Sequence, residues 1–102
     1  MDKLKLSGGP EKTVTSIWLD PEEGSQLKVE YYDFSELAQR MFGNDIAYTL
    51  TVKAMAKLFS LTNQDEASLI NWMMGEFKNY FEIKRWLEEN RIDFSVKIES
   101  WA

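Results

Sequence analysis

Any catalytic chemistry in this chain would have to use serine, lysine, tyrosine or carboxylate side chains, because its 102 residues include no cysteine and no histidine. Their absence removes cysteine nucleophiles, serine–histidine pairs and imidazole or thiolate zinc sites. The stretch Ser25-Gln26-Leu27-Lys28 has the S-x-x-K spacing of acyl-transferring enzymes, in which the serine opens a helix and the lysine follows one turn later. Here the stretch straddles a turn and an expected strand. The side chains of Ser25 and Lys28 would point apart, so we expect no acyl-transfer site.

The acidic residues show no spacing that indicates acid–base catalysis or metal binding. Asp20, Glu22 and Glu23 lack the spacing and the central glycine of a calcium loop, and we interpret them as a solvated turn. No pair of carboxylates is singled out for general acid–base work. We therefore expect that the protein is not an enzyme and that it binds no cofactor and no metal ion.

The charge balance limits the classes of partner. The chain has 12 Lys and Arg against 17 Asp and Glu, a net charge of −5. This excess disfavours direct nucleic-acid binding, which needs clustered cations, and favours a basic partner if there is one. No window approaches the length of a membrane-spanning apolar segment, and the start MDKLKLSGGP lacks the apolar core of a signal peptide. We expect a cytoplasmic protein that does not bind membranes.

The stretch 72–86, WMMGEFKNYFEIKRW, holds five of the fourteen aromatic residues of the chain. On a helical wheel most of its large side chains share one face with Ile70, which is typical of core packing. Trp72 falls away from that face, next to Gly75. A tryptophan in such a place is typical of an interface anchor, the alternative being that a second layer of the protein covers it.

The elements that must position these residues follow from periodicity and turn chemistry. Strands are predicted at 4–6, 13–19, 26–33, 45–52 and 92–100. Helices are predicted from the Asp33 capping box to Gly43, over 53–61, after a cap at Thr62 or Asn63, and from about 80 to Asn90. We therefore predict one α+β domain spanning 1–102. It has an antiparallel sheet of four to five strands and three to four helices packed mainly on one face, in the order β-β-β-α-β-α-α-α-β.

The alternation of the strands also predicts which side chains lie inside. In the last strand Ile92, Phe94, Val96 and Ile98 are expected to face inward. The other face of the sheet is expected to be partly exposed through a second set of residues: Tyr32, Thr13, Thr15, Thr49, Thr51 and Lys97.

These observations favour a small, acidic, non-catalytic domain that binds another protein. One specific form is a stoichiometric inhibitor, such as the immunity-type partner of a basic protein. The residues expected to bind that partner are Trp72, Tyr32, Asp20, Glu22, Glu23, Glu30 and Glu76. Two alternatives stay open. One is a homodimeric structural module, built through the threonine-rich sheet face or the last strand. The other is a small-molecule-binding domain whose pocket is lined by Trp72, Tyr80 and Trp86.

Overall fold

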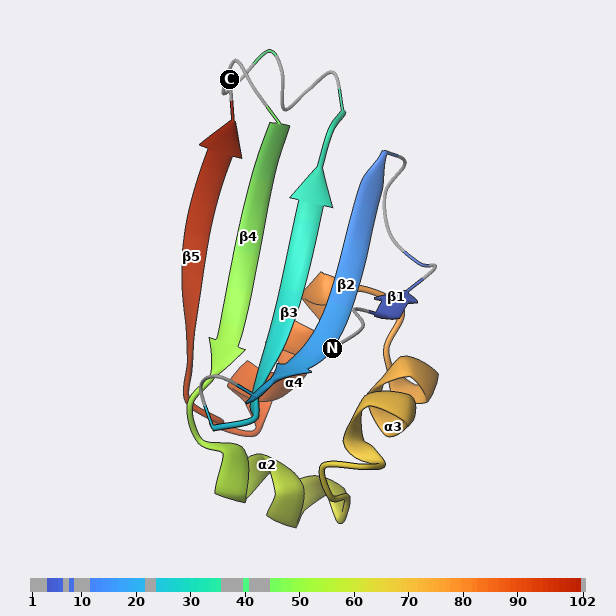
Figure 1. The fold of residues 1–102 in the computed structure, drawn as a ribbon, viewed down its shortest axis with the longest axis vertical. Coiled ribbons are helices and arrows are strands. Elements are labelled where there is room, and N and C mark those ends of the chain that lie inside the picture. Colours follow the sequence, from blue (N-terminus) through green and yellow to red (C-terminus); the bar gives the residue numbers. More distant parts are fainter. Residues whose placement is uncertain are drawn as a thin grey trace.

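The computed structural model describes residues 4–6, 8, 12–21, 24–35, 40 and 45–101. Its strands are β1 (Leu4–Leu6), β2 (Thr13–Asp20), β3 (Gln26–Asp33), β4 (Asp45–Val52) and β5 (Phe94–Trp101). The helices of this described part are α2 (Met55–Thr62), α3 (Leu69–Glu76) and α4 (Tyr80–Glu89). In Figure 1, α4 lies behind the lower half of the sheet, while α2 and α3 lie around the lower end of the strands.

The five strands form one antiparallel sheet in the order β1-β2-β3-β4-β5. Short connections join β1 to β2 and β2 to β3, whereas all three described helices lie between β4 and β5. β5 therefore closes the sheet at one edge, next to β4, and the three-residue β1 forms the other edge. The long strands stand side by side in Figure 1, and their upper ends extend beyond the described helices.

Alternation along the strands divides the sheet into two faces. The face toward the helices, called the helix face below, carries apolar side chains that are fully buried at its centre: Ile17, Leu27, Val29, Leu50 and Val52. These pack with residues that the helices contribute at helical spacing, chiefly Leu58, Leu69, Met73, Ile83 and Leu87. The opposite face is called the open face. Removing these apolar side chains from water is the main stabilising contribution to the fold.

The end of α4 sets the direction of β5. Asn90 is the C-cap residue, and Arg91 follows with a positive φ of 56°. The N–H of Ile92 donates to the carbonyl of Leu87 at 2.9 Å, and the N–H of Arg91 donates to the carbonyl of Glu88 at 3.2 Å. These two bonds are those of a Schellman motif, which satisfies the last carbonyls of a helix and turns the chain away from its axis.

The predicted α+β class is confirmed: the antiparallel sheet has five strands, within the predicted four to five, and the described residues contain three helices. The helix predicted between Asp33 and Gly43 lies almost wholly outside the described residues. Within them, the carboxylate of Asp33 accepts a hydrogen bond from the N–H of Ser35 at 2.9 Å.

Two local predictions were wrong. Thr62 and Asn63 do not cap the next helix: the Thr62 hydroxyl donates to the carbonyl of Leu58, and Asn63 ends α2 in the left-handed region. Instead, the carboxylate of Asp65 accepts from the N–H groups of Ala67 and Ser68, and α3 begins only at Leu69. This turn shortens α3, because residues 65–68 form the turn and the helix starts only after them.

The second error concerns the first long strand. Thr13 and Thr15 pair with Asp33 and Tyr31, which places them on the helix face and not on the open face. Thr15 is only 2% exposed. Threonine and valine alternate at the start of this strand, and both residue types are β-formers. Alternation alone therefore did not decide whether the threonines or their neighbours face the core.

Candidate functional site

The candidate site is the edge of the sheet formed by β5. This strand has eight residues, and its only described neighbour in the sheet is β4. An edge strand of this length presents a row of backbone N–H and C=O groups to solvent on its outer side. Such a row can pair with a strand of another chain.

An apolar groove lies beside this edge, between β5 and α4. It has a volume of about 310 Å³. We call it the edge groove, and its lining residues are Tyr48, Tyr80, Phe81, Lys84, Val96 and Ile98. Three of these apolar side chains are well exposed: Ile98 at 62%, Phe81 at 42% and Val96 at 37%. Exposed apolar side chains that adjoin one another mark interaction surfaces more often than singly scattered ones do.

The exposure of Val96 and Ile98 corrects the prediction that they face inward as core residues. They do lie on the helix face, paired with Leu50 and Tyr48 of β4. However, α4 packs over β3 and leaves the outer edge of the sheet uncovered, so β5 extends beyond the helix layer. Of the four residues predicted to be inward, Ile92 is buried and Phe94 is half-buried.

Behind the edge groove, four aromatic rings form a compact group, called the tyrosine cluster: Tyr31, Tyr48, Tyr80 and Phe81. The rings of Tyr31 and Tyr48 stack with centroids 5.7 Å apart and planes 8° apart. Phe81 meets Tyr31 edge-on at 4.8 Å, and Tyr80 lies 6.1 Å from Tyr48. Offset and edge-on contacts of this kind stabilise the packing of the rings that lie at the floor of the groove.

The phenols of this cluster are poorly suited to act as bases. Burial, with smaller contributions from the charges of Tyr48 and Glu88, raises the pKa of Tyr80 to about 12. Burial, and next the nearby charge of Asp33, also raises the pKa of Tyr31. Both groups therefore keep their protons at neutral pH, where a general base must be able to accept one.

Trp72, the predicted anchor, is half-buried in a second aromatic group with Phe77 and Trp86. Its ring centroid lies 6.0 Å from each of the other two, and those two are 5.6 Å apart. Much of the Trp72 side chain is therefore covered by another part of the protein, as in the alternative stated for this residue. Trp72 and Trp86 belong to this group, whereas Tyr80 lines the edge groove, so the three residues expected around one pocket are divided between two places.

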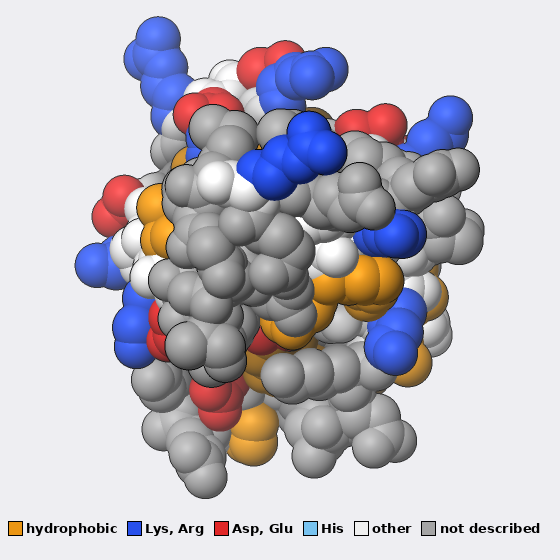
Figure 2. Space-filling model, turned by 90° about the horizontal axis from the view of Figure 1, so that it is seen from above, with side chains coloured by type: hydrophobic (Ala, Val, Ile, Leu, Met, Phe, Trp, Pro, Cys, Tyr) orange, Lys and Arg blue, Asp and Glu red, His pale blue; other side chains and the backbone are white. Residues whose placement is uncertain are grey.

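The other predicted binding residues are spread over different surfaces. Asp20, Glu30 and Tyr32 lie on the open face, Tyr32 with its ring 6.0 Å from that of Phe34. Lys28 lies between Asp20 and Glu30 on that face, and the exposed Glu76 ends α3 in the helix layer. Glu22 and Glu23 lie outside the described residues. Viewed down the strands, acidic and basic side chains are also intermixed around the outline of the molecule (Figure 2).

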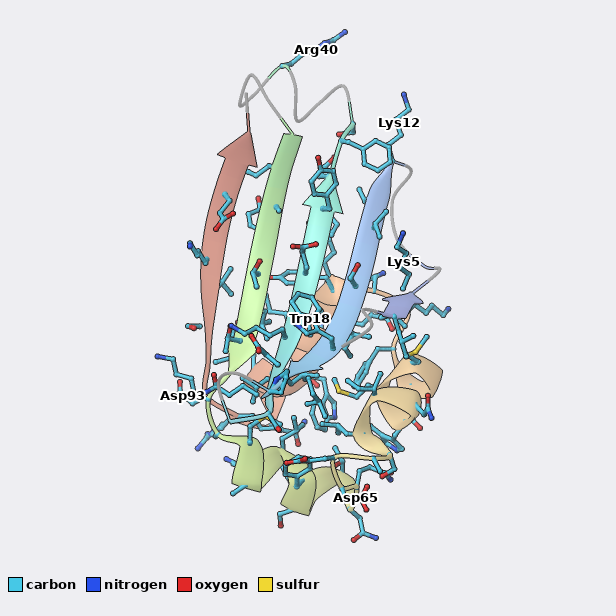
Figure 3. All side chains as sticks on the ribbon, viewed as in Figure 1. Lys5, Lys12, Trp18, Arg40, Asp65 and Asp93 are labelled. Carbon is cyan, nitrogen blue, oxygen red and sulfur yellow. The ribbon has the colours of Figure 1, made fainter. Side chains whose placement is uncertain are left out.

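Another hollow of about 240 Å³ lies between the first strands and α3. Its lining includes Trp18, which lies across the strands on the open side of the sheet in Figure 3. The remaining lining residues are Leu4, Leu19, Glu66, Ala67, Ile70 and Asn71. Of these apolar side chains only Leu4 is a large exposed one, at 38%, so this hollow offers less apolar surface than the edge groove.

The described residues contain no cluster of three or more carboxylates that could hold a metal ion. Within the same residues, no helix is both long and apolar enough to cross a bilayer. Ser25 has a positive φ of 59° in the turn before β3, and Lys28 points from β3 to the open face. Comparison with protein-family models, with curated proteins and with solved structures found no match to this chain.

Sequence reasoning missed the residues that make the edge groove, namely Phe81, Val96, Ile98, Tyr48 and Lys84. The alternation in the last strand placed Val96 and Ile98 on the correct face, but the face alone does not determine burial. The alternative of a homodimer built through the last strand named this element, but no pattern in the sequence identified the side chains that line the groove beside it.

Proposed function

We propose that this protein is a non-catalytic protein-binding domain whose binding site is the β5 edge together with the edge groove. The observation that carries this proposal is the coincidence of an eight-residue edge strand with three exposed apolar side chains that adjoin it. A partner strand added to β5 would satisfy its outer backbone groups. Side chains of that partner would cover Ile98, Phe81 and Val96.

The chemistry of the groove supports binding over catalysis. Its lining is apolar apart from two phenols and the amine of Lys84, which lies 3.5 Å from a carboxylate oxygen of Glu88. A partly exposed ion pair of this type contributes little energy. Burial raises the pKa of Tyr80, which lines the groove, and that of Tyr31 behind it, and this favours packing roles for these two phenols.

A small molecule is the second candidate occupant of the same groove. Ligand pockets usually have volumes of roughly 300 to 1,000 Å³ and enclose most of their ligand. The edge groove, at about 310 Å³, is at the lower limit of that range. This size fits a few side chains of a protein partner better than a cofactor. Stabilisation of the protein by a metabolite in a thermal-shift screen, lost in Ile98→Lys, would support the small-molecule alternative.

The narrower form of the proposal, an inhibitor or immunity-type partner of a basic protein, is supported by the net charge of −5. The described acidic residues Asp20, Glu30 and Glu76 lie on more than one surface, which gives less support to a focused acidic site. Steered binding of a basic partner would weaken steeply between 50 and 500 mM salt, roughly the range over which screening shortens from above 10 Å to below 5 Å. An interaction through the edge groove would change much less.

Site-specific photo-crosslinking in cells of the source tests the protein-binding function. The photoreactive residue p-benzoylphenylalanine replaces Phe81, which lines the groove, and in a control it replaces Phe34, which is similarly exposed at 43%. We expect protein adducts from position 81 that are absent from position 34 and that disappear when Ile98→Lys is added. Equal adducts from both positions, or none from position 81, would contradict the proposal.

A further inference from the structure

The hydrogen-bond pattern of the sheet shows which peptide groups of β5 point outward. In antiparallel pairs, hydrogen-bonded and non-hydrogen-bonded residue pairs alternate. The N–H of Phe34 donates to the carbonyl of Lys12 at 3.0 Å, and the N–H of Lys53 donates to the carbonyl of Asp93 at 2.9 Å. Extended through the register of the sheet, both bonds give the same result: the odd-numbered residues of β5 bond β4. The peptide groups of Phe94, Val96, Ile98 and Ser100 therefore face the outer edge.

The inference that follows rests on the proposed function and names the partner. We propose that β5 pairs antiparallel with β5 of a second copy of this chain, with Ile98 opposite Ile98 on the two-fold axis. The two sheets then form one continuous sheet. In this register Ile98 exchanges both backbone hydrogen bonds with its copy, and Val96 exchanges bonds with Ser100 on either side. Edge-to-edge pairing of identical strands is a closed, symmetric contact, so it stops at the dimer.

Charge complementarity on the open face favours this register over those with the axis at residue 97 or 96. Lys97 is opposite Glu99 of the second copy, and Glu99 is opposite its Lys97, so two opposite-charge pairs flank the axis. Moving the axis to residue 97 would put Lys97 opposite Lys97. Moving it to residue 96 would put Glu99 opposite Asp93. Both alternatives place like charges directly across from each other, which destabilises a strand pair.

Within one chain Lys97 and Glu99 already form an ion pair, with a nitrogen–oxygen distance of 3.0 Å. Their side chains are 77% and 43% exposed, so water competes for both ends of this contact. In the dimer each carboxylate would lie between two amines, one from its own strand and one from the second copy.

The apolar surface on the helix face matches the same axis. Ile98 is the most exposed of the large apolar side chains in the described residues, at 62%, and it would lie against its own copy. Val96 lies on the same face of β5 and Phe81 lines the same groove, so the two edge grooves would lie side by side on one face of the continuous sheet. The contact of each Ile98 with its copy accounts for the most exposed apolar side chain of this edge.

Sedimentation equilibrium of the purified chain tests the dimer. We expect a concentration-dependent approach to twice the 12.0 kDa chain mass. Ile98→Lys would place two like charges on the axis and should give a monomer at every concentration, with unchanged circular dichroism. Lys5→Glu, at an exposed lysine of the opposite edge strand (Figure 3), is the control and should leave the dimer intact.

The register is tested by charge reversal. Lys97→Glu and Glu99→Lys, made singly, each create two like-charge contacts across the axis and should raise the dissociation constant about tenfold. Made together, they restore opposite charges at both contacts and should return the dissociation constant to within about twofold of the wild-type value. Dissociation constants that are the same for both single variants and the double variant would overturn this register. A dimer that persists in Ile98→Lys would overturn β5 as the interface.

The crosslinking experiment separates this inference from the function on which it rests. An adduct of position 81 with a second copy supports both. A chain that sediments as a monomer but forms adducts with a different protein overturns the dimer and leaves the protein-binding function standing. A monomer without any adduct from position 81 overturns both.

Discussion

The hydroxyl oxygen of Thr15 accepts a hydrogen bond from the backbone N–H of Tyr80 at 3.0 Å, across 65 residues of sequence. Thr15 lies on the helix face of β2, and Tyr80 is the first residue of α4. The first N–H groups of a helix have no partner within the helix, so a sheet side chain supplies one here. This contact fixes the start of α4 against the sheet and thereby positions Tyr80 and Phe81 beside the edge groove.

Replacing Thr15 with valine, the apolar residue of the same shape, should therefore destabilise the protein. Thr15→Val keeps the shape but leaves the N–H of Tyr80 buried without an acceptor. We expect it to lower the free energy of unfolding by about 1 to 3 kcal/mol, measured by urea denaturation. Thr51→Val, the same exchange on the open face, is the control and should change stability by less than about 0.5 kcal/mol. Equal effects of the two changes would contradict a specific role for the Thr15 hydroxyl.

The fold class and most elements were predictable because they depend on local patterns. Alternating apolar residues in 26–33 and 45–52 predicted strands whose bounds the structure reproduces. The wheel drawn from Ile70 placed Met73, Phe77 and Tyr80 correctly on the buried face but was wrong for Phe81, because Phe77 adopts an extended backbone and Asn79 caps the new helix. The side chain of Asn79 accepts from the N–H groups of Phe81 and Glu82, a cap that ends the old register and starts another.

This break explains why the candidate site was not predictable from the same patterns. With α4 in a new register, Phe81 leaves the buried stripe and lines the edge groove, where it is 42% exposed. Trp72, in contrast, meets Phe77 and Trp86 across the break and becomes half-buried. Exposure at an edge depends on where the helix layer ends in space, and no periodicity within one strand or helix contains that information.

Replacing glycine with alanine should have opposite effects on stability at two positions, Gly75 and Gly8. A Cβ at Gly75 would have no atom within 4 Å, and the residue lies inside α3, so Gly75→Ala should stabilise the protein by about 0.5 to 1 kcal/mol. A Cβ at Gly8 would lie 2.7 Å from both the Cβ and the carbonyl oxygen of Lys78. Gly8→Ala must displace that backbone, to which the Gly8 N–H donates at 3.1 Å, and should destabilise the protein. Differential scanning calorimetry measures both, and melting temperatures that move in the same direction would contradict this account.

The tyrosine cluster predicts a loss of stability at alkaline pH. The pKa of Tyr80 rises from 10.0 to about 12 in the folded protein, mainly through burial. Above pH 10 the unfolded chain therefore releases this proton before the folded chain does, and stability decreases as the pH rises from 10 toward 12. For this one group the loss between pH 8 and pH 11 is about 1.4 kcal/mol.

Urea denaturation of the wild type and Tyr80→Phe at pH 8 and pH 11 measures this contribution. The variant should lose about 1.4 kcal/mol less than the wild type over that interval. Some alkaline sensitivity should persist, because the pKa of Tyr31 is also raised. Parallel losses in wild type and Tyr80→Phe would show that Tyr80 does not titrate in this way.

The turn from α4 into β5 contains a residue that a glycine should improve. Arg91 occupies the left-handed position of the Schellman motif, with φ at 56°. A side chain costs roughly 1 kcal/mol there and glycine is the residue that usually fills the position. Its carbonyl accepts from the amine of Lys57 at 2.9 Å, and this contact is kept by any residue because it uses the backbone. Arg91→Gly should therefore raise the free energy of unfolding by about 0.5 to 1 kcal/mol.

The matched control is Arg85→Gly, at an exposed arginine in the interior of α4. At that position the low helix propensity of glycine is not offset by relief of a positive φ. We expect the free energy of unfolding to decrease by about 1 kcal/mol. Urea denaturation of both variants gives the comparison, and opposite signs are expected from one and the same exchange. A loss of stability in both would mean that Arg91 contributes contacts worth more than the strain it carries. Because Arg91 directs the chain into β5, a stabilised turn should also slow amide hydrogen exchange at the start of that strand.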